Sequence, residues 1–176
     1  MLGVDHRDTL TTLSNLAKLL AVSKGPGNRR EALDLCRQAL EARERTLGRH
    51  HPKTLTSINN LAMLHLRRGE VGEAAQLFRE VVDERRRDHG PEHPSSLLAL
   101  GNLAVSLTKL GDAAAVREAR SLRADEARTK EAVYGADHPL ARQARRRLVR
   151  ASALMIKIEH AVDALGDKKL QPKNAH

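Results

Sequence analysis

The sequence repeats itself at intervals of 42 to 45 residues, and this period constrains the fold more than any other feature. A histidine opens each interval, and the tripeptide Asn-Leu-Ala begins nine residues after each of the first three histidines. The histidines are His6, His51, His93 and His138, and the asparagines are Asn15, Asn60 and Asn102. Internal periods of this length are typical of stacked helical units.

Each interval has the pattern of two helices joined by a short turn. In the second interval, Pro52 suits a helix start because its missing N–H would have no helical partner there. Apolar residues then recur at spacings of three and four up to Gly69, which ends the helix. A second helix is predicted from about Val71 to Asp88. Neither helix can bury its apolar face alone, so neighbouring units must cover each other.

The repeats therefore predict an all-α chain, an α-solenoid of about three helix-turn-helix units with a long C-terminal capping helix. The expected parts are an array over 1–166, with units at about 6–48, 51–90 and 93–135 and the capping helix at 139–165, and a disordered tail over 167–176. The capping helix is predicted from an apolar stripe that would cover the last unit.

The third unit departs from the pattern, because three extra residues lie between Gly111 and Gly135. They either lengthen or interrupt its second helix. The residues that stand where Ala74 and Phe78 stand in the second unit are Val116 and Arg120, or Ala119 and Arg123 if the insertion comes earlier.

The net charge of +9 favours acidic partners, through an attraction that salt weakens. Five arginines crowd the start of the last helix: Arg142, Arg145, Arg146, Arg147 and Arg150. They form either a solvated end-capping face or an anion-binding patch. Nucleic-acid binding through this face is an alternative function, but Phe78 and Tyr134 are the only aromatic side chains of Phe, Tyr or Trp type on which bases could stack.

The sequence offers no catalytic motif, so an enzyme, a cofactor and a metal site are not expected. His89 and His93 have a metal-like spacing, but the prolines and glycine around them break the helix that would align them. Cys36 occupies the position that Phe78 fills one unit later, which favours a buried apolar role over a reactive thiol. The sequence has no apolar run long enough for a membrane span and no cleavable leader, so a cytoplasmic protein without a membrane partner is expected.

Several stretches of the second unit resemble a known repeat. These are Leu47-Gly48-Arg49-His50-His51-Pro52-Lys53-Thr54-Leu55, Asn59-Asn60-Leu61-Ala62, Arg68-Gly69-Glu70 and Glu73-Ala74. They resemble the tetratricopeptide repeat of kinesin light chains, strongly over 47–90 and less closely over 2–47 and 90–137. The resemblance implies a non-enzymatic protein-interaction scaffold whose first helices line a concave groove, with a cargo or adaptor protein as partner.

The resemblance also implies a candidate binding site. In related repeats the asparagine column helps to hold an extended peptide, and an asparagine side chain both donates to and accepts from a peptide backbone. The candidate residues are Asn15, Asn60 and Asn102, with Asn59, Lys18, Met63, Arg67, Lys109 and Ser14 as neighbours. This polar and basic set favours an acidic peptide. The alternative is structural, with each asparagine bonded to a neighbouring helix.

Two further possibilities concern the whole chain. Residues 2–6 match the last turn of a unit, which predicts a short array, or a piece of a longer protein, whose first helix pair lacks an N-terminal cap. That exposed end is a candidate for self-association. The same observation suits a regulatory or sensor segment of a larger signalling protein.

Overall fold

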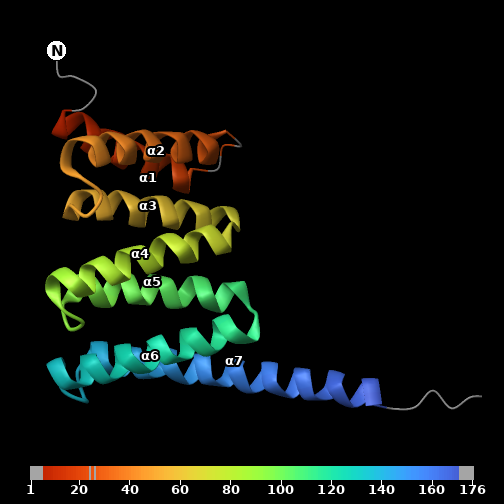
Figure 1. Cartoon of the computed structure of the whole chain (residues 1–176). Helices are drawn as coiled ribbons and strands as arrows, with labels where there is room; N and C mark the ends of the chain where they lie inside the picture. The colour runs from red at the N-terminus through yellow and green to blue at the C-terminus, as the bar shows by residue number, and fades with distance from the viewer. Residues whose placement is uncertain (1–5, 24, 26, 171–176) are drawn as a thin grey trace, which may run out of the picture. The chain divides into compact units, whose positions relative to one another are not determined.

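The computed structural model describes residues 6–23, 25 and 27–170 of the 176-residue chain, and within them all regular structure is helical (Figure 1). The helices are α1 (Arg7–Val22), α2 (Asn28–Leu47), α3 (Pro52–Arg68), α4 (Val71–His89), α5 (Pro94–Leu110), α6 (Ala113–Tyr134) and α7 (Pro139–Leu170). The chain divides into two compact units, Met1–Ser106 and Leu107–His176, which are described separately below. The predicted all-α class is confirmed.

The repeated histidines are helix caps. In each case the histidine Nδ1 atom accepts a hydrogen bond of 3.2 Å from the backbone N–H two residues later, at Asp8, Lys53, Ser95 and Leu140. This bond satisfies one of the donors that the first turn of a helix leaves without a partner. The period of the sequence is therefore the period of the helix starts.

The glycine at the end of each repeat has a distinctive backbone conformation. Gly48 has φ of 84°, a region that side-chain-bearing residues rarely adopt, and its N–H donates to the carbonyl of Glu44 at 3.0 Å. Gly69, between α3 and α4, has the same φ in a left-handed cap. The chain can therefore reverse sharply at these positions and begin the next helix.

In the first unit, α1 packs against α2, α2 against α3, and α3 against α4. Phe78 has no exposed surface, and neither has Ile58 or Val81. The assignment of Phe78 to the core is confirmed.

Buried polar contacts join the repeats of the first unit. The Thr54 hydroxyl donates to the Arg43 carbonyl at 3.5 Å, and one repeat later the Ser96 hydroxyl donates to the Arg85 carbonyl at 3.0 Å. The Arg43 guanidinium donates to the hydroxyls of Ser14, at 3.1 Å, and Ser57. One arginine of α2 thus connects the first helices of two successive repeats.

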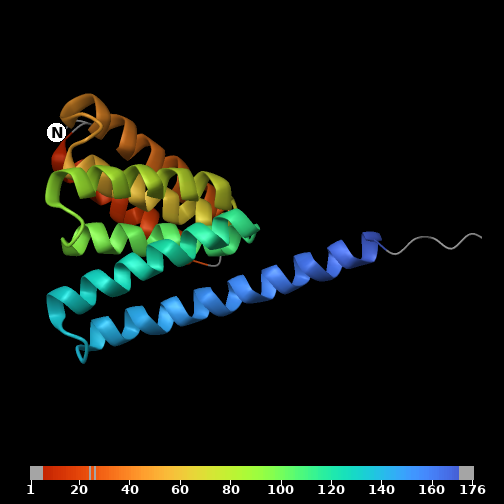
Figure 2. The same cartoon turned by 60° about the horizontal axis from the view of Figure 1, so that its bottom comes forward.

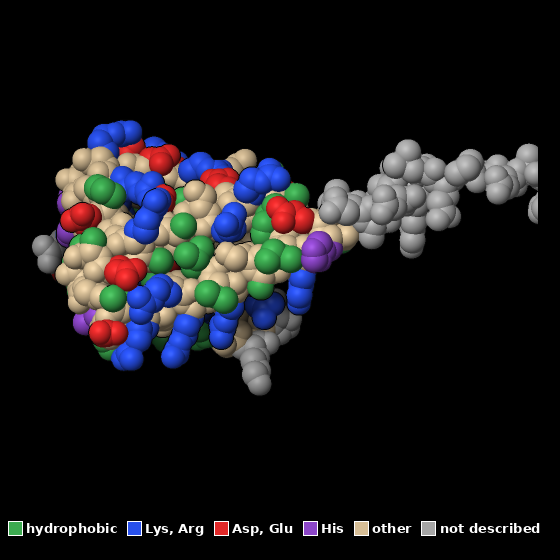
Figure 3. Space-filling view, turned by 90° about the horizontal axis from the view of Figure 1, so that it is seen from below, with side chains coloured by type: hydrophobic (Ala, Val, Ile, Leu, Met, Phe, Trp, Pro, Cys, Tyr) green, Lys and Arg blue, Asp and Glu red, His purple; other side chains and the backbone are tan. Residues whose placement is uncertain are grey.

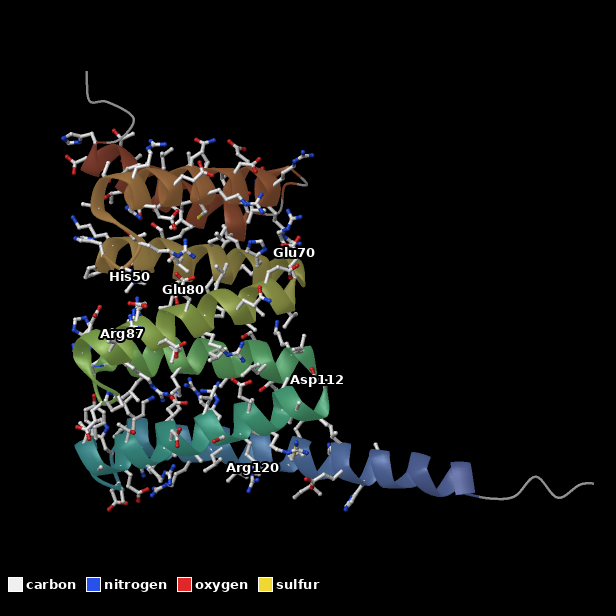
Figure 4. All side chains as sticks on the ribbon, viewed as in Figure 1. His50, Glu70, Glu80, Arg87, Asp112 and Arg120 are labelled. Carbon is white, nitrogen blue, oxygen red and sulfur yellow. The ribbon has the colours of Figure 1, made fainter. Side chains whose placement is uncertain are left out.

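Ion pairs connect the loop that follows α2 with helix α4 (Figure 4). The Arg49 guanidinium donates to both carboxylate oxygens of Glu80 at 2.7 Å, which is a bidentate pair. His50 lies 2.9 Å from Glu84, which also accepts from Arg87 at 2.8 Å. These contacts hold the second repeat against the loop of the first.

In the second unit, α6 and α7 lie side by side and antiparallel (Figure 2). The extra residues lengthen α6 to 22 residues, against 19 in α4, without interrupting it. Ala119 and Arg123 are both buried whereas Arg120 is exposed, so the insertion comes before Ala119. Arg123 therefore takes the position of Phe78.

Helix α7 corrects one predicted boundary. The capping helix was expected over 139–165 with a disordered tail over 167–176, but the helix continues to Leu170. Gly166 alone weakens a helix by only about 1 kcal/mol, which does not suffice to end it. The remaining tail, 171–176, lies outside the described residues, as do residues 2–5 of the motif that suggested an uncapped N-terminal end.

Candidate functional site

A cavity of about 320 Å³ lies in the first unit between α1, α2 and α3. Its lining residues are Lys18 and Val22 of α1, Cys36 of α2, and Asn60, Met63, Leu64 and Arg67 of α3. Four of the predicted site residues therefore meet at one place. None of the described side chains that line this cavity is acidic, so its charge comes from Lys18 and Arg67.

Helical spacing explains how these side chains come together. Asn60, Met63, Leu64 and Arg67 follow one another at intervals of three, one and three residues, which places them on one side of α3. Val22 lies one helical turn beyond Lys18 on α1. The sequence prediction missed Val22, Leu64 and Cys36 as lining residues, although the same spacing rule would have found the first two.

Cys36 contributes a thiol to the wall of the cavity. The side chain is buried, and this burial raises the pKa of the thiol, an effect that the charges of Lys18 and Arg43 oppose only in part. The raised pKa favours the protonated thiol, which agrees with the predicted buried apolar role. Cysteine is also smaller than phenylalanine, so the position that Phe78 fills completely in the next repeat leaves space here.

The asparagine column divides into residues with different surroundings. Asn60 lines the cavity, whereas Asn15 is exposed on α1 outside it. Asn102 donates from Nδ2 to Oδ1 of Asn59 at 3.1 Å, and both side chains are partly buried. Asn102 thus makes the contact with a neighbouring helix that the structural alternative required.

Two other predicted neighbours lie elsewhere. Ser14 is buried, and its hydroxyl accepts from Arg43 and donates to the Leu10 carbonyl at 2.9 Å, so it supports the packing and does not line the cavity. Lys109 is exposed and belongs to the second unit. The offsets within a helix were correct, but they could not show which way each side chain faces.

The sequence profile of the tetratricopeptide repeat family matches residues 27–83 and 59–119. These overlapping matches cover more than half of the chain. The chain belongs to the tetratricopeptide repeat family. Repeats of this family (TPRs) generally mediate protein–protein interactions and are generally non-enzymatic.

Solved TPR structures of the kinesin light chain-like type resemble this TPR protein over nearly its whole length. One is a single-residue variant of a Podosopora anserina protein that has nearly identical TPR-like repeats and is provisionally assigned as a kinesin light chain. It is 26% identical to this chain, with a TM-score of 0.78. The match covers 95% of this chain and 76% of the other. A second structure of the Podosopora anserina protein is 25% identical with a TM-score of 0.76, over 97% and 81% of the two chains.

A third solved structure, BtubC (BKLC) of P. vanneervenii, is 19% identical with a TM-score of 0.69, over 96% of this chain and 66% of the other. At this identity the likeness concerns the fold alone. No protein with a curated description matches this TPR chain.

The described part of this TPR chain has neither a metal-binding cluster nor a membrane-spanning helix. No group of three or more His, Cys, Asp or Glu side chains there is arranged to hold a metal ion, and the rings of His89 and His93 instead lie against each other with centroids 4.6 Å apart. No helix among those residues is both long and apolar enough to cross a membrane.

The Asn59–Asn102 contact leads to a stability prediction. Replacing Asn102 with alanine is expected to lower the free energy of unfolding by about 0.5 to 1.5 kcal/mol, because Asn59 loses its hydrogen-bond donor. Asn15→Ala is the matched control, since Asn15 is exposed and its loss should change stability by less than about 0.5 kcal/mol. Urea unfolding followed by circular dichroism measures both, and equal effects would show that the Asn102 contact contributes nothing.

Proposed function

We propose that this TPR protein is a cytoplasmic, non-enzymatic interaction module, a kinesin light chain-like scaffold that binds an acidic, extended peptide of a partner or cargo protein. The observation that carries the proposal is the cavity in which Asn60 lies with Lys18 and Arg67. The same arrangement supplies an amide, two positive charges and an apolar floor at one place.

Each part of the cavity suits one part of such a peptide. The Asn60 side chain can accept from a backbone N–H and donate to a backbone carbonyl, whichever residue the peptide presents. Lys18 and Arg67 attract carboxylates, and Arg67 can bind one in a bidentate manner. Met63 adapts its shape to different apolar groups. The proposed ligand is therefore a peptide with acidic residues on either side of an apolar one.

Replacing Asn60 with alanine is expected to weaken binding of a fluorescently labelled acidic peptide by about two- to tenfold, the equivalent of one or two hydrogen bonds. Helical content, measured by circular dichroism, should stay unchanged because Asn60 is only half-buried. Fluorescence anisotropy at physiological salt measures the affinity. Loss of the fold in Asn60→Ala would instead assign this asparagine to structure.

Asn15→Ala is the control for this titration, since Asn15 lies outside the cavity. A labelled single-stranded RNA at low and physiological salt tests the alternative of nucleic-acid binding. RNA binding that collapses with salt, without any peptide binding, would move the function to the arginine-rich face of α7.

The aromatic side chains favour the peptide over RNA. Phe78 has no exposed surface, and the Tyr134 ring stacks on the His138 ring with centroids 5.0 Å apart. Bases would therefore find neither ring free on both faces, although proteins that bind single strands generally use such rings.

Self-association through the N-terminal end stays a prediction. Leu16, Leu19 and Val22 of α1 are exposed, and exposed apolar side chains at neighbouring helical positions favour association. Val22 also lines the cavity, so a dimer through this surface would compete with the peptide.

A further inference from the structure

One side of α7 exposes apolar and basic side chains together, and Figure 3 shows such side chains next to each other on the face of the molecule seen from below. We define the α7 outer face by Arg142, Arg146, Val149, Arg150, Ile156 and Lys157, whose spacings place them on one side of the helix. Val149 is 67% exposed and Ile156 is 52% exposed. An open hollow of about 460 Å³, lined by Arg145 as well as by Arg142, Arg146, Val149 and Arg150, lies along the first part of this face.

The repeat register shows what this face corresponds to. Helix α7 starts with the same capped His-Pro pair as α3, so Arg142 and Val149 stand where Leu55 and Ala62 stand in α3. In α3 both positions are buried, on the side turned away from the Ser57 contact with α2, and α4 packs against this helix. In α7 the same positions are exposed, because no described helix follows it.

The charge of the α7 outer face limits what can cover it. Arg142, Arg146 and Arg150 lie at intervals of four residues, and within the described residues none of them pairs with a carboxylate. By contrast, Arg145 pairs with Glu131 at 3.1 Å and Arg147 with Glu126 at 3.4 Å. Arg146 and Arg150 flank the exposed Val149 along the helix, so a partner must bring both carboxylates and apolar side chains.

We propose that the α7 outer face is a docking surface for an acidic amphipathic helix of a partner protein, in the place on α7 that α4 takes on α3. Apolar side chains of the partner cover Val149 and Ile156, and its carboxylates meet Arg146 and Arg150. This surface is separate from the cavity of the first unit, and the proposal goes beyond the peptide function.

Other occupants fit this face less well. RNA would satisfy the arginines, but its phosphates gain nothing from Val149 and Ile156. A second copy of the same face would place arginines opposite arginines in a symmetric dimer, which repel each other. An anionic vesicle surface is distinguished from a partner helix by the experiment below.

The chain itself supplies a probe of the right chemistry. Residues 70–84 comprise Glu70 and the first fourteen residues of α4, the helix that packs against α3, and they contain five acidic residues and one basic residue. A labelled peptide of this sequence, stapled between positions 72 and 76 because short helices are marginally stable in water, is titrated against the full chain at physiological salt. Binding is expected at concentrations below about 1 mM.

The variant Arg146→Glu/Arg150→Glu should weaken binding of this stapled peptide about tenfold, since two attractions become repulsions. Val149→Asn should weaken it several-fold by removing apolar contact. The matched control is Arg29→Glu/Arg37→Glu, which makes the same charge change at exposed positions of α2 and should bind like the natural chain. A stapled peptide with lysine at its acidic positions should not bind.

Three outcomes would overturn the proposal: no binding of the stapled peptide, equal binding by the Arg146→Glu/Arg150→Glu variant and the natural chain, or preferential binding of RNA or phosphatidylserine vesicles to this face. Asn60→Ala should leave stapled-peptide binding unchanged, and the arginine variant should still bind the extended acidic peptide. The failure of one function is thereby distinguished from the failure of the other.

Discussion

Replacing Phe78 with alanine is expected to lower the free energy of unfolding by about 3 to 5 kcal/mol. The ring has no exposed surface, and Leu55 and Ile58 of α3 and Val81 of α4 are also buried. Its removal takes apolar contacts from α4 and leaves a cavity that neighbouring side chains refill only in part. Urea unfolding followed by circular dichroism measures the loss.

Two substitutions serve as controls for Phe78→Ala. Phe78→Leu should cost less, because most of the apolar volume remains. Cys36→Ala changes the equivalent position one repeat earlier, where only a sulfur atom is removed beside an existing cavity, and it should also cost much less. If Phe78→Ala left stability unchanged, the packing of α4 described above would be wrong.

The second large effect is expected at Glu126, which is 1% exposed in the second unit. Its carboxylate accepts from Arg123 at 2.6 Å and from Lys130 at 2.7 Å, and Arg147 lies at 3.4 Å. Glu126→Gln is expected to lower the free energy of unfolding by about 3 to 5 kcal/mol, because it removes the buried negative charge to which Arg123 and Lys130 donate. Chemical denaturation at neutral pH measures the change.

The same carboxyl predicts a pH dependence. Burial alone raises the pKa of Glu126, but the hydrogen bonds and charges of Lys130 and Arg123 outweigh it and hold the pKa below its ordinary value of 4.5. A carboxyl with a lowered pKa in the folded state stabilises that state fully above the ordinary value, and this stability is lost as the pH falls below it. Glu126→Gln should remove this part of the acid sensitivity.

The paired variant Arg123→Leu/Glu126→Leu is the control for Glu126→Gln. It replaces both buried charges with apolar side chains, which is often neutral for a buried pair, so it should recover much of the lost stability. If the Glu126→Gln variant were as stable as the natural chain, the ion pairs of Glu126 would not be formed in solution.

The helices could be predicted from the sequence because their signals are local. The second helix of the second repeat is predicted over 71–88 and is α4, Val71–His89, because Gly69 and Gly90 mark its two ends. The contacts that join the repeats were not predictable in the same way. An arginine such as Arg43 is expected on the surface of a helix. Only the contacts that it makes with Ser14 of α1 and Ser57 of α3 show why it is buried.

The candidate site could be predicted only in part for a similar reason. Four of its residues were found because their offsets recur along the first helices of the repeats. Asn59 and Asn60 are adjacent, however, and a period alone does not show that one faces Asn102 and the other a cavity. The insertion in the third repeat could also lie at either of two positions in the sequence. Only the burial of Arg123 shows that this residue, and not Arg120, is equivalent to Phe78.

The junctions between repeats affect how such an array can gain repeats by duplication. Gly48, Gly90 and Gly135 share φ of 84° and similar ψ of 161°, 166° and 155°, and a capping histidine follows each of them three residues later. A gene duplication with both ends at this glycine would add a whole unit whose new boundaries have the same backbone conformation as the old ones. A duplication that begins inside a helix would interrupt its hydrogen bonds. The period of the sequence is thus also the step by which an array of this kind can lengthen during evolution.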